Sequence, residues 1–220
     1  MVKSTTKSLI AVGLLSASAL AQAGLSANIG ASSEYYFRGY DLSEGPMMSG
    51  GLDYEADNGL YAGVWVAGFE NPTDASDPAT SDDNELEYDI YGGYAGEFGD
   101  ISYSVGYTGY FYKEADISFH EINFNFGYEF LSLEATFGTE DDDTSADATD
   151  DDYTFIALTG EYEGAYLTLG TYGKDYDGDY AELGYGTSFQ GLDFGVAYVS
   201  TDSDIDSDGM YFTIGKSFDL

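Results

Sequence analysis

The chain has 220 residues, of which 41 are Asp or Glu and only 6 are Lys or Arg, so its formal net charge at pH 7 is −35. Binding to nucleic acid depends on clustered lysines and arginines, so this composition argues against nucleic acid as a partner. The absence of cysteine excludes disulfides and thiolate chemistry. With 22 Tyr, 14 Phe and 29 Gly, the chain is too aromatic for the disorder that an acidic composition would otherwise favour.

The first 23 residues have the features of an export signal. Lys3 and Lys7 give a positively charged start, residues 9–20 form a short apolar stretch, and residues 21–23 (AQA) form a small-x-small cleavage site. We therefore expect cleavage after Ala23, which leaves residues 24–220 as the mature protein. No second long apolar run follows, so the sequence predicts no transmembrane helix.

After the signal, apolar residues alternate with polar or small ones in about twelve segments, and a period of two indicates β-strands. The predicted strands, in chain order, are 25–40, 48–56, 60–69, 85–94, 101–112, 118–130, 133–138, two strands flanking residues 163–164, 180–189, 192–200 and 210–220. In the first of these, the alternation places Leu25, Tyr35 and Phe37 on the apolar face, opposite Glu34 and Arg38.

The hairpin over residues 85–112 shows the pattern most clearly. One face of its first strand is apolar, whereas the other carries Glu85, Glu87 and Asp89, and a turn is predicted at residues 96–100. A sheet with one apolar and one polar face is either a half-buried soluble sheet or the wall of a membrane barrel. In a barrel these three carboxylates would form an acidic mouth at the outer end.

The connections between the predicted strands alternate in length. Every second connection is short, while residues 70–84, 140–152 and 201–209 form long acidic loops. Short turns at one end and longer loops at the other are typical of outer-membrane barrels. The sequence therefore predicts that residues 24–220 form an all-β fold, a closed antiparallel up-and-down transmembrane β-barrel of about twelve strands in outer-membrane lipid. The alternative is a soluble β-sandwich that uses the same apolar face as its core.

Several segments resemble a known family. Residues 33–40 (SEYYFRGY) are similar to the opening motif of the TorF-type porins of proteobacteria, and residues 50–54, 59–65, 87–94 and 103–107 also resemble that family. The resemblance is specific over residues 25–112 and looser beyond them, although the ending at 216–218 also fits. It implies an outer-membrane barrel and a porin, and it implies no catalytic residues.

The polar face of such a barrel would line its lumen. The expected lumen-lining residues are Glu34, Arg38, Asp53, Glu55, Glu85, Glu87, Asp89, Glu121, Glu134, Glu161 and Glu182. A lumen rich in carboxylates favours cations and repels anions. We therefore predict an outer-membrane porin that lets small polar solutes or ions diffuse passively, with a preference for cations.

An alternative is a non-conducting barrel with a structural or surface-interaction role. Twelve strands lie between the filled eight-stranded barrels and the open sixteen-stranded porins, so the acidic side chains could fill the lumen instead of lining a path. Arg38 is the only basic residue expected on the polar face, and pairing with an acidic neighbour is a better explanation for it than a dedicated contact with a solute.

Two loops contain fragments of calcium-binding sequences. Residues 204–209 (DIDSDG) match the first half of an EF-hand loop, but Gly215 stands where the loop needs a glutamate, and residues 175–179 match only in part. We expect at most weak divalent-cation binding on these external loops, no dedicated metal site and no cofactor.

Enzyme activity has little support in the sequence. His120 is the only histidine, and Ser118, two residues away on the same predicted strand, is the nearest candidate nucleophile. Such neighbours do not readily align for attack, and no G-x-S-x-G motif is present. We therefore predict that the protein is not an enzyme and has no catalytic residues.

Overall fold

The computed structural model describes residues 24–71, 84–115, 117–142 and 151–220. The predicted export signal lies outside the described residues, as do parts of the acidic segments 70–84 and 140–152. Every regular element within the described residues is a β-strand. Among those residues, no helix has the length and apolar character needed to cross a membrane.

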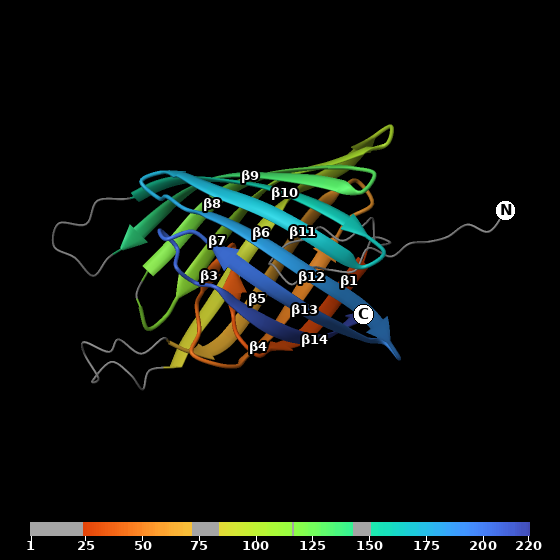
Figure 1. Ribbon diagram of the computed structural model, residues 1–220. Coiled ribbons are helices and arrows are strands. Elements are labelled where there is room, and N and C mark those ends of the chain that lie inside the picture. Colours follow the sequence, from red (N-terminus) through yellow and green to blue (C-terminus); the bar gives the residue numbers. More distant parts are fainter. Residues whose placement is uncertain (1–23, 72–83, 116, 143–150) are drawn as a thin grey trace.

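Twelve of the fourteen strands found in the described residues form one closed antiparallel barrel (Figure 1). The wall strands are β1 (Gly24–Ser32), β4 (Met47–Glu55), β5 (Leu60–Glu70), β6 (Asn84–Phe98), β7 (Ile101–Tyr112), β8 (Ile117–Tyr128), β9 (Leu131–Asp142), β10 (Asp151–Tyr162), β11 (Ala165–Lys174), β12 (Asp179–Phe189), β13 (Leu192–Thr201) and β14 (Gly209–Asp219). Neighbours in the chain are neighbours in the wall, and β14 pairs with β1 from Ser26↔Asp219 to Ser32↔Thr213 to close the ring. The predicted twelve-stranded barrel is confirmed.

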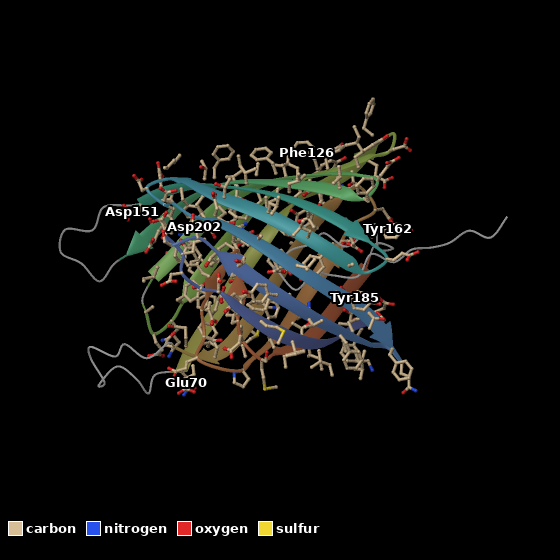
Figure 2. All side chains as sticks on the ribbon, viewed as in Figure 1. Glu70, Phe126, Asp151, Tyr162, Tyr185 and Asp202 are labelled. Atoms are coloured by element: carbon tan, nitrogen blue, oxygen red, sulfur yellow. The ribbon has the colours of Figure 1, made fainter. Side chains whose placement is uncertain are left out.

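The two ends of the barrel differ in the length of their connections (Figure 1). At the turn end, strands are joined by tight turns such as Glu163-Gly164 and Gln190-Gly191, whose φ values of 52° and 87°, and 54° and 76°, suit two-residue type I′ turns. The longer connections lie at the opposite, loop end, where Figure 2 shows Glu70, Asp151 and Asp202. The predicted alternation of short and long connections is therefore present.

The outward face of the wall is apolar. Ile90 and Phe137 are about half exposed, as are large apolar side chains from every other wall strand. Figure 2 shows Phe126, Tyr162 and Tyr185 projecting from the outside of the barrel. Soluble monomers rarely expose a contiguous apolar surface of this extent, whereas a lipid-facing barrel requires one.

On the inward face, tyrosine rings lie over glycines of the neighbouring strand. Tyr91 is directly paired with Gly63, and a Cβ atom on Gly63 would lie 2.4 Å from the Tyr91 ring. The same directly paired arrangement joins Tyr153 to Gly138, Tyr180 to Gly170 and Tyr166 to Gly184. Because the rings lie against the wall, the hydroxyl groups of Tyr91, Tyr153 and Tyr166 reach carboxylates of nearby strands.

The prediction that the first strand runs to Tyr40 is wrong. β1 ends at Ser32, and the chain then turns into the barrel as a hairpin of two short strands, β2 (Tyr36–Phe37) and β3 (Tyr40–Asp41). Tyr35, which the period of two places on the apolar outer face, is instead buried inside the barrel with 4% of its surface exposed. The hairpin leaves the wall because its aromatic side chains and its single arginine find partners across the lumen.

Other boundaries differ by a few residues. β6 continues to Phe98, so the turn predicted at 96–100 is only Gly99-Asp100, and β9 begins at Leu131 instead of Leu133. A wall in lipid must pair every backbone group until the chain reverses, so the strands extend beyond the clear alternation of their side chains.

A charge on the outward face is expected to destabilise the barrel according to its depth. Ile90→Lys, near the middle of β6, should lower the free energy of unfolding in lipid vesicles by about 2–4 kcal/mol, because the ammonium would face hydrocarbon. Phe98→Lys, at the turn end of the same strand, is the matched control and should cost at most about 1 kcal/mol. Urea titrations followed by Trp65 fluorescence measure both, and equal losses would contradict a lipid-facing wall.

Candidate functional site

The hairpin between β1 and β4 enters the barrel from the loop end, and Arg38 and Gly39 form its tip. Their φ values are 47° and 95°, so the tip is a two-residue turn with positive φ at both positions. This conformation is uncommon for a residue with a side chain, so the contacts of Arg38 must hold it. The Tyr172 hydroxyl on β11 donates a hydrogen bond to the Arg38 carbonyl at 3.2 Å.

Aromatic side chains fix the hairpin to the wall on both flanks of β1 and β4, the two strands that it joins. Tyr35 packs against Phe69 of β5, with 5.2 Å between ring centroids, while Tyr36 stacks on Tyr211 of β14 at 5.4 Å. These contacts belong to two buried clusters: Tyr35, Met47, Ala67 and Phe69 in one; and Tyr36, Phe155, Ala157, Tyr180, Ala197, Val199, Ile205 and Tyr211 in the other. The hairpin therefore spans the lumen.

Arg38 makes the only ion pairs inside the described part of the barrel. Its guanidinium donates to both oxygens of Glu121, at 2.5 and 3.2 Å, and to Glu134 Oε1 at 2.5 Å. It also lies over the Phe155 ring, 4.5 Å from the centroid. Burial by itself would lower the pKa of Arg38, but Glu121 and Glu134 raise it well above its usual value, so the guanidinium stays charged.

Glu121 is the centre of this network. Besides Arg38, its oxygens accept hydrogen bonds from Tyr153 at 2.6 Å, Tyr110 at 3.0 Å and Asn123 at 2.8 Å. A buried carboxylate is stable only when it is paired and its lone pairs are satisfied, and Glu121 meets both conditions. The expectation that Arg38 fixes a network of acidic residues agrees with these contacts.

The lumen is filled in its loop half and reaches solvent in its turn half. Many inward side chains of the loop half are buried; Glu87 and Phe155, for example, are both 0% exposed. Inward side chains nearest the turn end, such as Asp53, Glu55 and Glu161, are partly exposed. The difference follows from the hairpin, which occupies the loop half alone.

The structure separates the predicted lumen-lining residues into three groups. Glu34 and Arg38 belong to the hairpin and not to the wall. Glu85, Glu87, Asp89, Glu121, Glu134 and Glu182 point inward from the wall strands around the hairpin, and Asp53, Glu55 and Glu161 point into the turn half. Whether any of them lines a conducting path stays a prediction.

The expected acidic mouth of Glu85, Glu87 and Asp89 is wrong. These side chains are almost fully buried, because the hairpin and the connection after β7 cover them. Glu85 accepts hydrogen bonds from the backbone N–H groups of Glu114 and Ala115, at 2.9 and 3.0 Å. It therefore holds that connection in place instead of facing water.

The acids of the hairpin itself serve its own geometry. Glu34 Oε2 accepts a hydrogen bond from the Gly45 N–H at 3.1 Å, and Asp41 accepts one from the Ser43 N–H at 3.4 Å. Partial burial raises the pKa of Asp41, and the Ser43 hydrogen bond opposes that rise. These contacts shape the return of the chain to β4.

The turn half of the lumen has paired tyrosines and carboxylates on its walls. The Tyr91 hydroxyl and the Asn28 amide both donate to Asp53, the latter at 3.1 Å. A similar arrangement lies nearer the hairpin, where Glu182 accepts from Tyr166 at 2.6 Å and from Tyr211 at 3.1 Å. These groups are polar and oriented, and those nearest the turn end can exchange hydrogen bonds with solvent or a solute.

His120 lies on the outer surface near the loop end. Ser118 Oγ and Asp141 Oδ2 approach the same ring nitrogen, Nε2, at 3.5 and 3.4 Å, while Tyr107 lies 2.6 Å from Nδ1. A catalytic triad needs the nucleophile and the orienting acid on different ring nitrogens. The arrangement therefore lacks the geometry of a serine hydrolase.

Sequence reasoning missed the hairpin, although two signals pointed to it. Residues 35–40 place the dipeptide Arg38-Gly39 between aromatic residues, and residues 43–46 (SEGP) form a turn-rich return before β4. A single arginine in a strongly acidic chain also suggested a buried partner. The period of two continued through this segment, however, and hid the turn.

A comparison with models of protein families identifies the family of this chain. Residues 16–218 match a family described as "Bacterial protein of unknown function (Gcw_chp)". The chain belongs to the Gcw_chp family. This match does not carry the TorF name, and no curated protein matches the chain.

Solved structures with the same architecture are porins and other membrane proteins. A structure of the KdgM porin shares 7% identity, covers 89% of this chain and 99% of its own, and superposes with a TM-score of 0.54. The KdgM porin in complex with disordered oligogalacturonate gives 6% identity, the same coverages and a TM-score of 0.55. A structure from work on in-meso crystallization of membrane proteins shares 10% identity, covers 89% of this chain and 83% of its own, and superposes with a TM-score of 0.57. At these identities the likeness establishes the barrel fold.

Loss of Arg38 is expected to destabilise the protein far more than loss of an exposed lysine. Arg38→Ala leaves Glu121 as an uncompensated buried carboxylate, so the free energy of unfolding should fall by about 3–5 kcal/mol. Arg38→Lys keeps the charge but loses the two-pronged contact, and its loss should be intermediate. The control Lys174→Ala removes an exposed pair with Asp152, of 3.4 Å, and should cost at most about 1 kcal/mol. Denaturation in detergent micelles measures all three, and similar losses for Arg38→Ala and Lys174→Ala would contradict the assigned role.

Proposed function

We propose that the protein is an outer-membrane porin, a passive diffusion channel for small polar solutes or ions that prefers cations. The observation that carries this proposal is a closed barrel with an apolar outside and a polar, acidic inside whose turn half reaches solvent. The resemblance of residues 33–40 to TorF-type porins supports the same assignment.

Location in the outer membrane follows from the wall and from the start of the chain. The apolar outer face needs lipid, and a wall of strands satisfies all its backbone groups there only because the ring is closed. We propose that residues 1–23 act as the export signal and are removed, which delivers residues 24–220 to the outer membrane of a Gram-negative cell.

The preference for cations rests on the balance of charge along the lumen. After residue 23 the chain has only Arg38, Lys113, Lys174 and Lys216 as strongly basic residues. The Arg38 guanidinium is already paired with two carboxylates, and none of the lysines points into the turn half of the lumen. Carboxylates in a confined, low-dielectric passage attract cations and raise the barrier for anions.

The solute bound by one structural neighbour is not one that we expect this chain to pass. Oligogalacturonate, which the KdgM complex contains, is polyanionic. The acidic turn half would repel such a solute, and the one lumen arginine is already paired. We therefore favour cations and neutral polar solutes as the permeating class.

A second candidate function is a non-conducting barrel, and one specific observation favours it. The hairpin packs against both sides of the lumen, and the inward side chains around it are buried. If the hairpin never leaves this position, the barrel has no through path in its loop half. Its role would then be structural or at the cell surface.

Planar-bilayer recording tests both candidates. The wild-type protein is expected to give small conductance steps, and replacing residues 35–42 by a short Gly-Ser linker should enlarge them several-fold, because the constriction is removed. A silent wild type with a conducting hairpin variant would support the non-conducting barrel. Silence of both, with correct folding shown by heat-modifiable gel migration, would overturn the porin proposal.

Selectivity is tested in the same bilayers under a salt gradient. The reversal potential should indicate cation preference, and the double variant Asp53→Asn, Glu55→Gln should move it towards zero, because both acids face the turn half. The exposed loop acid variant Asp204→Asn is the control and should change it little. An anion-selective wild type would contradict the proposed preference.

A further inference from the structure

Two carboxylates beneath the hairpin have no cation of the protein to pair with. Glu87 and Asp89 are alternate residues of β6, they point into the lumen, and they are 0% and 1% exposed. Neither forms an ion pair in the part of the chain that the structure describes. The charged groups that act on Asp89 are Glu87 and Glu121, and both are acidic.

The hydrogen-bond partners of this pair are also incomplete. Glu87 Oε1 accepts a bond from the Tyr112 hydroxyl at 3.0 Å, but Glu87 Oε2 and both oxygens of Asp89 have no partner among the described residues. The Tyr35 hydroxyl and Asp89 both lie beside Glu87, but none of these contacts has the distance and angles of a regular hydrogen bond. Four buried oxygen atoms from the wall and the hairpin are thus left without partners in one region.

The chain contains no further basic residue that could compensate this pair. After residue 23, Arg38 is bonded to Glu121 and Glu134, Lys113 to Glu114, and Lys174 to Asp152, while Lys216 lies over the Phe218 ring. Because buried carboxylates without partners are costly, the compensating charge must come from outside the chain, as a proton or as a bound cation.

We propose that Glu87, Asp89 and the Tyr35 hydroxyl form a binding site for a hard divalent cation of the calcium type, closed over by the hairpin. Such ions take oxygen ligands, above all carboxylates, whereas zinc prefers nitrogen and sulfur. Two carboxylates match the charge of one divalent ion. Since they supply only part of the six to eight oxygens that calcium takes, water completes the shell.

The site gives the hairpin a function beyond constriction. One ligand comes from the hairpin and two from the wall, so a bound cation joins them and neutralises the repulsion between Glu87 and Asp89. Anything that binds the folded state alone stabilises it by mass action. Cation binding is therefore coupled to the seated hairpin, and this inference stands whether or not the barrel conducts.

Thermal unfolding of the full-length protein in detergent tests the site, with CaCl2 compared with chelator at matched ionic strength. At a calcium concentration about ten times the dissociation constant, the midpoint should rise by about 3–6 °C. Asp89→Asn and Glu87→Gln should abolish the rise. In chelator both variants should be at least as stable as the wild type, because each removes one of two repelling charges.

Two controls separate the site from other acids of the chain. Asp53→Asn changes a lumen acid that already has two donors, and the double variant Asp204→Asn, Asp206→Asn removes loop carboxylates; both should keep the full rise. Terbium luminescence sensitised by the neighbouring tyrosines gives an independent readout, which Glu87→Gln should abolish. The proposal is overturned if the loop variant alone removes the rise, or if Asp89→Asn keeps it. It is also overturned if the wild type responds to pH but not to calcium, since a shared proton would then be the compensating charge.

Discussion

Closure of the wall is the constraint on which the rest of this structure depends. A strand facing lipid has no water with which to pair its backbone groups, so all twelve wall strands need two neighbours, and the pairing of β14 with β1 supplies the last one. Closure also determines the environment of the wall side chains, because successive residues of a strand must then point alternately to lipid and to the lumen. In a chain of formal net charge −35, that alternation directs much of the acidity inward.

The single arginine of the lumen neutralises part of this inward negative charge and holds the hairpin in the loop half. Arg38 reaches Glu121 and Glu134 only because the segment after β1 leaves the wall and crosses the barrel. Aromatic contacts on both sides then hold the hairpin, and tyrosines lying over glycines make room for it. The result is a barrel whose two halves differ: one is packed around an ion-paired hairpin, and the other is lined by partly exposed carboxylates.

The strands and their connections were predictable because they depend on local pattern. The alternation over residues 85–112, the short turns and the acidic loops all survive in β6, β7 and the two ends of the barrel. The failures occurred where a distant partner overrides the local pattern. Tyr35 and Phe37 keep the period of a strand yet lie inside, since Phe69 and Tyr110, which are remote in the chain, offer them aromatic contacts. Likewise, nothing near Glu87 in the sequence indicates that a hairpin from residues 33–46 would cover it.

The sequence by itself determined the fold class, the strand count, the orientation of the apolar face and the acidic character of the lumen, because period, turn chemistry and composition are local properties. Only the tertiary structure decided how that lumen is used. The pairing of Arg38, the burial of Glu85, Glu87 and Asp89, and the division into a filled and a partly exposed half all arise from contacts between segments far apart in the chain. Alternation assigns a side chain to the inside of a barrel, but only the closed ring shows what it meets there.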